Sequence, residues 1–188
     1  MRYIAGFLIA IGLIVLVFVV IFKLFTGGGS PAHQAKPLVS YANTGTSVQL
    51  IIDGPVVANQ NHREIKINVA DDQTEISVLK GYQNTLLKTK TYPNNSSAYG
   101  VFLRALDFAG FTKGVNNSQL ADYRGRCASG TTYIYQIINA SGNRTQQYWA
   151  NTCAGKGTFK GAATSITNLF EAQVPDYGNF TSDVNISG

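Results

Sequence analysis

The sequence has few charged residues and few residues that could carry chemistry. Charged side chains make up 13% of the 188 residues, about half the share that is usual for globular domains. It contains two cysteines and two histidines. A structural zinc site needs four ligands, and His33 lies in a segment rich in glycine and proline. We therefore expect no metal and no cofactor.

Well-marked catalytic motifs are also missing. The patterns G-x-S-x-G, H-E-x-x-H, G-x-G-x-x-G and the P-loop do not occur, which removes the enzyme classes that depend on them. The carboxylates are scattered singly apart from Asp71-Asp72. Two distant carboxylates could still meet in the fold, so the sequence favours a protein that is not an enzyme without settling the question. His62 lies in a polar segment and is expected to be a solvated loop residue.

One long uncharged run stands out at the N-terminus. Residues 4–22 contain no charged side chain, and a helix of this length comes close to spanning the roughly 30 Å hydrocarbon core of a bilayer. A cleaved signal peptide is the alternative, but its apolar part usually has only about 7–15 residues and ends at a small-residue site. The sequence predicts an uncleaved transmembrane anchor over residues 1–25.

The segment after the anchor predicts a spacer and an orientation. Residues 26–38 hold three glycines and two prolines, which is typical of a flexible linker. Arg2 favours a cytoplasmic N-terminus, and a cysteine pair suits an oxidising compartment. We expect a single-pass protein of the cell membrane with its C-terminal domain outside.

The rest of the chain predicts an α+β domain over residues 39–175 and a polar tail over residues 176–188. Alternating apolar residues indicate strands, and i, i+3, i+4 spacing indicates helices. The strands are expected from about residue 47 to 52, over 64–69, 75–78, 85–92, 131–138 and 144–151, and the helices over 99–110 and 162–174. The expected fold class is a single N-terminal transmembrane helix followed by a mainly antiparallel sheet, formed by a four-strand meander, a helix, a disulfide-tied hairpin and a helix.

The two cysteines predict a structural disulfide. The midpoint between Cys127 and Cys153 is residue 140, inside the turn expected over residues 139–143, so they should face each other at the open end of the hairpin. A redox pair usually has C-x-x-C spacing, which this sequence lacks.

Basic residues are concentrated in the middle of the chain. Residues 80–160 hold ten basic and two acidic side chains. Such a segment could bind an anionic envelope polymer, lipid headgroups or nucleic acid, although scattered lysines also serve solubility alone. The residues proposed for this anion-binding surface are Lys80, Lys88, Lys90, Arg124, Arg126 and Arg144.

Aromatic residues of the predicted hairpin offer a second kind of contact. Tyr133, Tyr135, Tyr148 and Trp149 could stack on sugars or bases, or could simply pack in the sheet. The sequence predicts a binding or interaction module of the cell envelope, whose partner could also be another surface protein. A membrane-anchored enzyme acting on the cell wall is the alternative.

A further alternative is a pilin-like subunit. An apolar N-terminal helix, a β-rich domain and a disulfide near the C-terminus resemble type IV pilins, and Gly6-Phe7 is similar to their leader-cleavage junction. Ile11 stands where pilins typically carry Glu. The resemblance implies assembly into a fibre.

Overall fold

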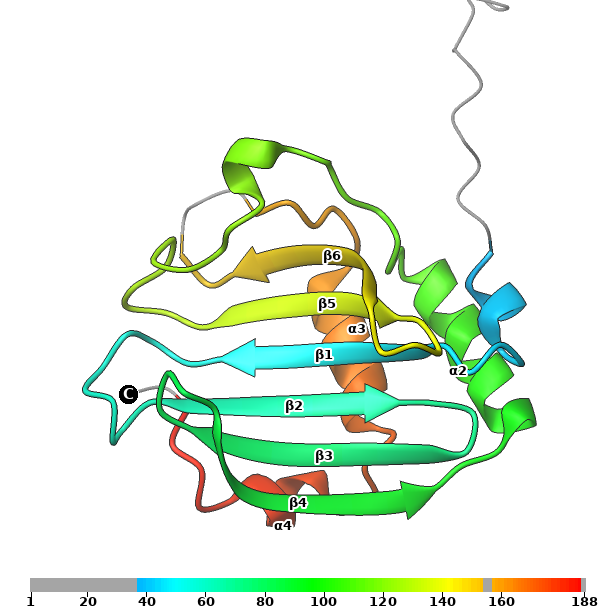
Figure 1. Ribbon diagram of the computed structural model, residues 1–188, viewed down its shortest axis with the longest axis horizontal. Coiled ribbons are helices and arrows are strands. Elements are labelled where there is room, and N and C mark those ends of the chain that lie inside the picture. The colour runs from blue at the N-terminus through cyan, green and yellow to red at the C-terminus, as the bar shows by residue number, and fades with distance from the viewer. Residues whose placement is uncertain (1–36, 154–156, 187–188) are drawn as a thin grey trace, which may run out of the picture. The chain divides into compact units, whose positions relative to one another are not determined.

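The computed structural model describes residues 37–153 and 157–186, and its centre is one sheet of six antiparallel strands (Figure 1). The strand order is β4-β3-β2-β1-β5-β6. The strands are β1 (Ser47–Asp53), β2 (Arg63–Val69), β3 (Gln73–Lys80), β4 (Thr85–Pro93), β5 (Thr132–Ile138) and β6 (Arg144–Asn151).

The first four strands form a meander in which apolar side chains line up across one face. Leu50 of β1 lies opposite Ile67 of β2, and Ile67 lies opposite Ile76 of β3. All three side chains are fully buried. Side chains of residues that lie directly opposite each other in neighbouring strands point to the same face of the sheet. These three side chains therefore form one apolar row across that face.

The fifth and sixth strands form a hairpin that joins the sheet next to β1. Tyr135 of β5 lies opposite Leu50, so β1 becomes an inner strand. The Asn139 side chain shapes the turn, since its oxygen accepts hydrogen bonds from the backbone N–H groups of Ser141 (3.1 Å) and Asn143 (2.9 Å). Gly142 has a φ of 76°, a left-handed conformation that glycine adopts without a steric penalty.

Among the described residues, the helices α2 (Ser96–Phe108) and α3 (Ala163–Glu171) cover one face of the sheet. The helix α2 buries Tyr99, Leu103 and Leu106, and α3 buries Ile166 and Phe170. In Figure 1, α3 lies behind the strands and α2 lies beside their right-hand ends. Asn95 caps α2 by accepting a hydrogen bond from the Ala98 N–H at 2.9 Å, which satisfies one of the free donors at a helix start. The short 3₁₀ helix η1 (Leu38–Tyr41) packs against α2.

The segment after β6 protects that edge of the sheet. The backbone N–H of Phe159 donates to the Trp149 carbonyl at 2.9 Å, and the Val115 N–H donates to Thr158 at 2.9 Å. A Cβ atom on Gly157 would lie 2.2 Å from the Trp149 carbonyl oxygen, so only glycine permits this approach. Among the described residues, β4 has no strand neighbour on its outer side.

The fold class expected from the sequence is wrong. The described residues form a mainly antiparallel six-stranded sheet with few and short helices, and no helix among them is long and apolar enough to cross a membrane. The run over residues 4–22, on which the expected transmembrane helix was placed, lies outside the described residues. So does most of the expected linker.

The ends of the domain also differ from the expectation. Leu38, expected in the linker, is buried in η1. The helix expected over residues 162–174 is α3, which ends at Glu171. A further helix, α4 (Tyr177–Thr181), lies within the expected polar tail. Phe180 and Val184 of that tail pack against the core. Apolar residues in a mostly polar segment therefore complete the core from the C-terminal end.

The structure joins Cys127 to Cys153 in a disulfide, with their Cα atoms 5.7 Å apart. The last ladder pair of the hairpin is Thr132 with Asn151, so the bridge lies just beyond the open end. Gly130 fits against it, since a Cβ there would lie 2.6 Å from the Cys127 Sγ. The disulfide ties the loop before β5 to the chain after β6.

Replacing both cysteines by serine should lower the melting temperature by roughly 6–12 °C. This range follows from a loss of about 3 kcal/mol for a loop of this length and about 2–4 °C per kcal/mol. Thermal unfolding followed by circular dichroism measures the shift. Adding reductant should lower the melting temperature of the unaltered protein and leave the double variant unchanged. Two reactive thiols per unreduced, unfolded chain would contradict the bridge.

Candidate functional site

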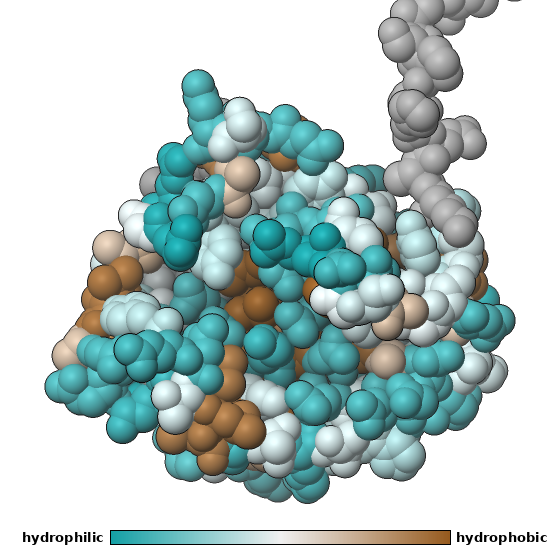
Figure 2. Space-filling view, viewed as in Figure 1, coloured by the Kyte–Doolittle hydropathy of each residue, from teal (hydrophilic) through white to brown (hydrophobic). Residues whose placement is uncertain are grey.

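The face of the sheet opposite the helices is partly covered by the loop before β5. Trp149 donates its indole N–H to the Leu120 carbonyl at 2.7 Å, and Leu120 belongs to the short 3₁₀ helix η2 (Ser118–Leu120). Ile51, Ile134 and Trp149 form a small buried cluster there, with Tyr123 packed against it. Figure 2 shows this face as mostly hydrophilic with hydrophobic atoms near its centre.

A buried group of titratable residues lies at one end of this face. Asp53 and Glu64 are opposite each other in the β1–β2 ladder. The Nε2 atom of His62 lies 3.0 Å from the Asp53 Oδ1, and its Nδ1 lies 3.3 Å from the Pro55 carbonyl. His62 is only 4% exposed and stacks on Tyr82 at 4.3 Å. The expectation of a solvated loop histidine is therefore wrong.

Burial changes the acidity of both carboxyls in this group. Glu64 is 7% exposed, and burial raises its pKa to about 7, with Lys66 opposing the rise and Asp53 adding to it. Burial also raises the pKa of Asp53, against the effect of His62. Carboxyl groups with shifted pKa values are typical of functional sites, and they also occur in purely structural networks.

The residues predicted to bind anions are divided between the two faces. Lys88 and Lys90 lie on the side of β4 that faces the helices, where Lys88 pairs with Asp183 and lies 4.9 Å from the Phe180 ring centre. The Nζ atom of Lys90 lies 2.6 Å from the Oδ2 atom of Asp176. Both acids come from the C-terminal segment, so these two lysines are already paired.

The other four predicted residues lie elsewhere. Lys80 ends β3 and lies opposite Arg63 in the ladder. Arg126 donates to the carbonyls of Gln119 and Asp122. The structure brings Arg124 and Arg144 together in one open cavity of about 420 Å³ on the face away from the helices, where Arg124 also forms two hydrogen bonds with Asp122 at 2.9 and 2.8 Å.

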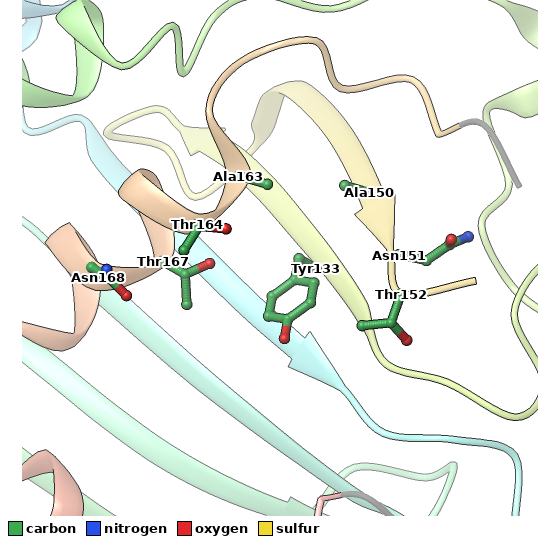
Figure 3. Close-up of a pocket in the computed structure, with 8 residues that line it drawn as sticks. All are labelled: Tyr133, Ala150, Asn151, Thr152, Ala163, Thr164, Thr167 and Asn168. Atoms are coloured by element: carbon green, nitrogen blue, oxygen red, sulfur yellow. The ribbon is translucent and has the colours of Figure 1, made fainter. Parts of the chain in front are cut away.

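A different arrangement surrounds Tyr133 on the helix-covered side. A cavity of about 380 Å³ lies between α3 and the ends of β5 and β6. In Figure 3 the Tyr133 ring lies between Thr164 and Thr167 of α3 on one side and Thr152 on the other. The lining residues are Tyr133, Ala150, Asn151, Thr152, Ala163, Thr164, Thr167 and Asn168. The Asn151 side chain points away from Tyr133 in Figure 3.

Tyr133 also lines a second cavity, of about 300 Å³, over the ends of β1 and β2. The lining residues are Ile52, Ile65, Tyr133, Tyr177, Thr181, Val184, Asn185 and Ile186. Because β5 lies between β1 and β6 in the sheet, Tyr133 separates the two cavities. We call the two cavities and the shared ring the Tyr133 groove.

The side chains that line the Tyr133 groove are polar or apolar but uncharged. Its lining consists of aromatic rings, hydroxyls, amides and aliphatic groups, and none of these side chains is charged. Hydroxyls and amides both donate and accept hydrogen bonds, and the combined size falls in the range of ligand pockets. Among the described residues, no group of histidine, cysteine and acidic side chains could hold a metal ion.

Sequence reasoning found one residue of this groove and missed the others. Tyr133 belongs to the aromatic residues singled out for stacking. Of the others, Tyr135 and Trp149 are buried in the two hydrophobic clusters, and Tyr148, like Tyr133, is half-buried against the larger cluster. Thr164, Thr167 and Asn168 follow the i, i+3, i+4 spacing of one helix face. This polar stripe was the available signal. No known family model matches the sequence, and no curated protein is significantly similar to it.

The titration of Glu64 predicts a pH dependence of stability. The folded protein retains a proton between pH 4.5 and about pH 7 that the unfolded chain has released. The free energy of unfolding should therefore fall as the pH rises through this window, by roughly 3 kcal/mol in all, and level off above it. Glu64→Gln should remove most of this decrease in urea unfolding measured between pH 4.5 and 8.5.

Glu75→Gln is the matched control, because Glu75 lies half-buried on β3, away from Asp53. It should keep the pH dependence of the unaltered protein. An equal loss of stability with pH in the Glu64 variant and in the unaltered protein would show that Glu64 is not the group responsible.

Proposed function

We propose that the protein is a non-enzymatic binding module of the cell envelope and that its ligand binds in the Tyr133 groove. The observation that carries this proposal is the half-buried Tyr133 ring between two cavities of about 380 and 300 Å³. Clefts of this size with an aromatic ring and a few polar groups are typical of binding sites. An aromatic side chain supplies contact area at a low entropic cost.

An extracytoplasmic location is part of the proposal. The Cys127–Cys153 disulfide supports it, because disulfides persist in oxidising compartments and are rare in the cytosol. The same location fits a partner in the envelope.

An enzyme acting on the cell wall is the second candidate. The neighbouring carboxyls of Asp53 and Glu64 favour it, because burial raises the pKa of both and a carboxyl with a raised pKa suits a general acid. Against it, neither carboxyl lines any of the three cavities described above. Glu64 is also only 7% exposed, so a substrate could reach its carboxyl only if neighbouring residues moved.

Tyr133→Ala should weaken binding to the envelope fraction of the source cells by about tenfold or more, since a central aromatic anchor typically contributes about 2 kcal/mol. Sedimentation of full-length protein with that fraction measures the binding. Phe108→Ala is the matched aromatic control, because Phe108 is 94% exposed at the end of α2, outside the groove. Equal binding of both variants and the unaltered protein would refute the proposed site.

A further inference from the structure

Two features of the Tyr133 groove limit what can bind there. Its lining is uncharged, and it lies over the helix-covered face of the sheet, where three of its four floor strands, β1, β2 and β5, are inner strands. From these features we infer that the ligand is an uncharged glycan chain that passes across the Tyr133 ring. The inference rests on the function proposed above and names the chemical class of the ligand.

The absence of charge in the lining argues against ionic ligands. A phosphate, carboxylate or ammonium group entering the groove would lose hydration without gaining a charged partner from the lining, which is strongly unfavourable. An acid next to the lining, Glu171 at the end of α3, is hydrogen-bonded to the Tyr177 hydroxyl, and burial together with this acid raises the pKa of Tyr177. Glu171 is therefore already paired, and it does not itself line either cavity.

The position of the groove argues against a peptide. Peptides in extended form usually bind by adding a strand to a free sheet edge, where backbone N–H and C=O groups are unpaired. In the Tyr133 groove the floor is formed by β1, β2, β5 and β6, and the ladder bonds of β1, β2 and β5 are made within the sheet on both sides. A peptide backbone would find few partners there.

An entirely apolar ligand fits no better. The first cavity carries the hydroxyls of Thr152, Thr164 and Thr167 and the amide of Asn168. Thr152 accepts a hydrogen bond from the Thr131 N–H at 3.0 Å, but covering Thr164 and Asn168 with hydrocarbon would remove their hydrogen bonds to water without replacing them, which is unfavourable. A lipid tail is therefore disfavoured.

A neutral sugar ring satisfies both kinds of surface. Its C–H face packs on an aromatic ring, and its hydroxyls donate and accept hydrogen bonds with threonine and asparagine side chains. The Tyr133 ring supplies the aromatic surface, and the threonines on either side in Figure 3 supply hydroxyls around it. Tyr177 and Thr181 repeat this combination in the second cavity.

Two such cavities on either side of one ring suit a chain of sugars more than a single sugar. One unit would lie between α3 and β6, and a neighbouring unit would lie beside α4. Binding should therefore strengthen with chain length up to the span of the groove, and the strength should depend little on salt, because no ion pair contributes.

The test uses immobilised full-length protein and the envelope fraction of the source cells, divided into untreated, exhaustively protease-digested and solvent-extracted portions. We expect all three portions to bind, with less than about a twofold change between 0.05 and 0.5 M salt. Acid hydrolysis of the captured material should yield neutral sugars and little uronic acid or phosphate. Thr164→Lys should weaken this capture by at least about tenfold.

Ser165→Lys is the matched control, because Ser165 is the exposed neighbour of Thr164 on α3 and does not line the groove. It should bind like the unaltered protein, and this pair of variants keeps the test independent of any instability in Tyr133→Ala. Binding that depends on Tyr133 but is abolished by protease, by solvent or by salt would overturn the glycan and leave the binding module standing. No binding that depends on Tyr133 would refute the binding module itself.

Discussion

The pairing of β5 with β1 is the contact on which the rest of the molecule depends. It joins strands that are some 80 residues apart in the chain, so it needs the long intervening segment to close before any contact is gained. Once formed, it turns the meander and the hairpin into one sheet and gives β1 a neighbour on each side. It also places Tyr133 opposite Ile52, and the binding groove arises from this adjacency.

The strands could be predicted because each one carries its own alternation of apolar and polar residues, as β2 does with Ile65, Ile67 and Val69. The cysteine pairing followed from spacing around one turn. The charge pattern was misleading because its partners are remote: Asp176 and Asp183 lie 86 and 95 residues from the lysines they contact. No local pattern links such pairs, so a basic segment in the sequence was not a basic surface in space.

The residues of the Tyr133 groove also come from remote parts of the chain that no local sequence pattern links. Thr152 follows β6, Thr164 lies on α3 and Thr181 ends α4, and each alone is an ordinary residue for its position. Likewise, Glu64 looked like a surface residue because strands with one solvated face alternate in this way, and His62 looked like one because it lies in a polar loop. His62 is buried by Tyr82, Asp53 and Pro55, and such contacts between irregular segments leave little periodic signal.

The two edges of the sheet are protected by different means. At β6 the backbone itself is occupied, through Phe159 and the close approach that Gly157 allows. At β4 protection comes from side chains, with lysines along the strand and Pro93 at its end, which are common ways of discouraging a further strand. Among the described residues the two edges are therefore unlike: the β6 edge is blocked at Trp149 by the protein's own chain, whereas side chains discourage pairing at the β4 edge. Copies that joined β4 to β6 would have to displace the segment with Phe159, which disfavours an open-ended ribbon.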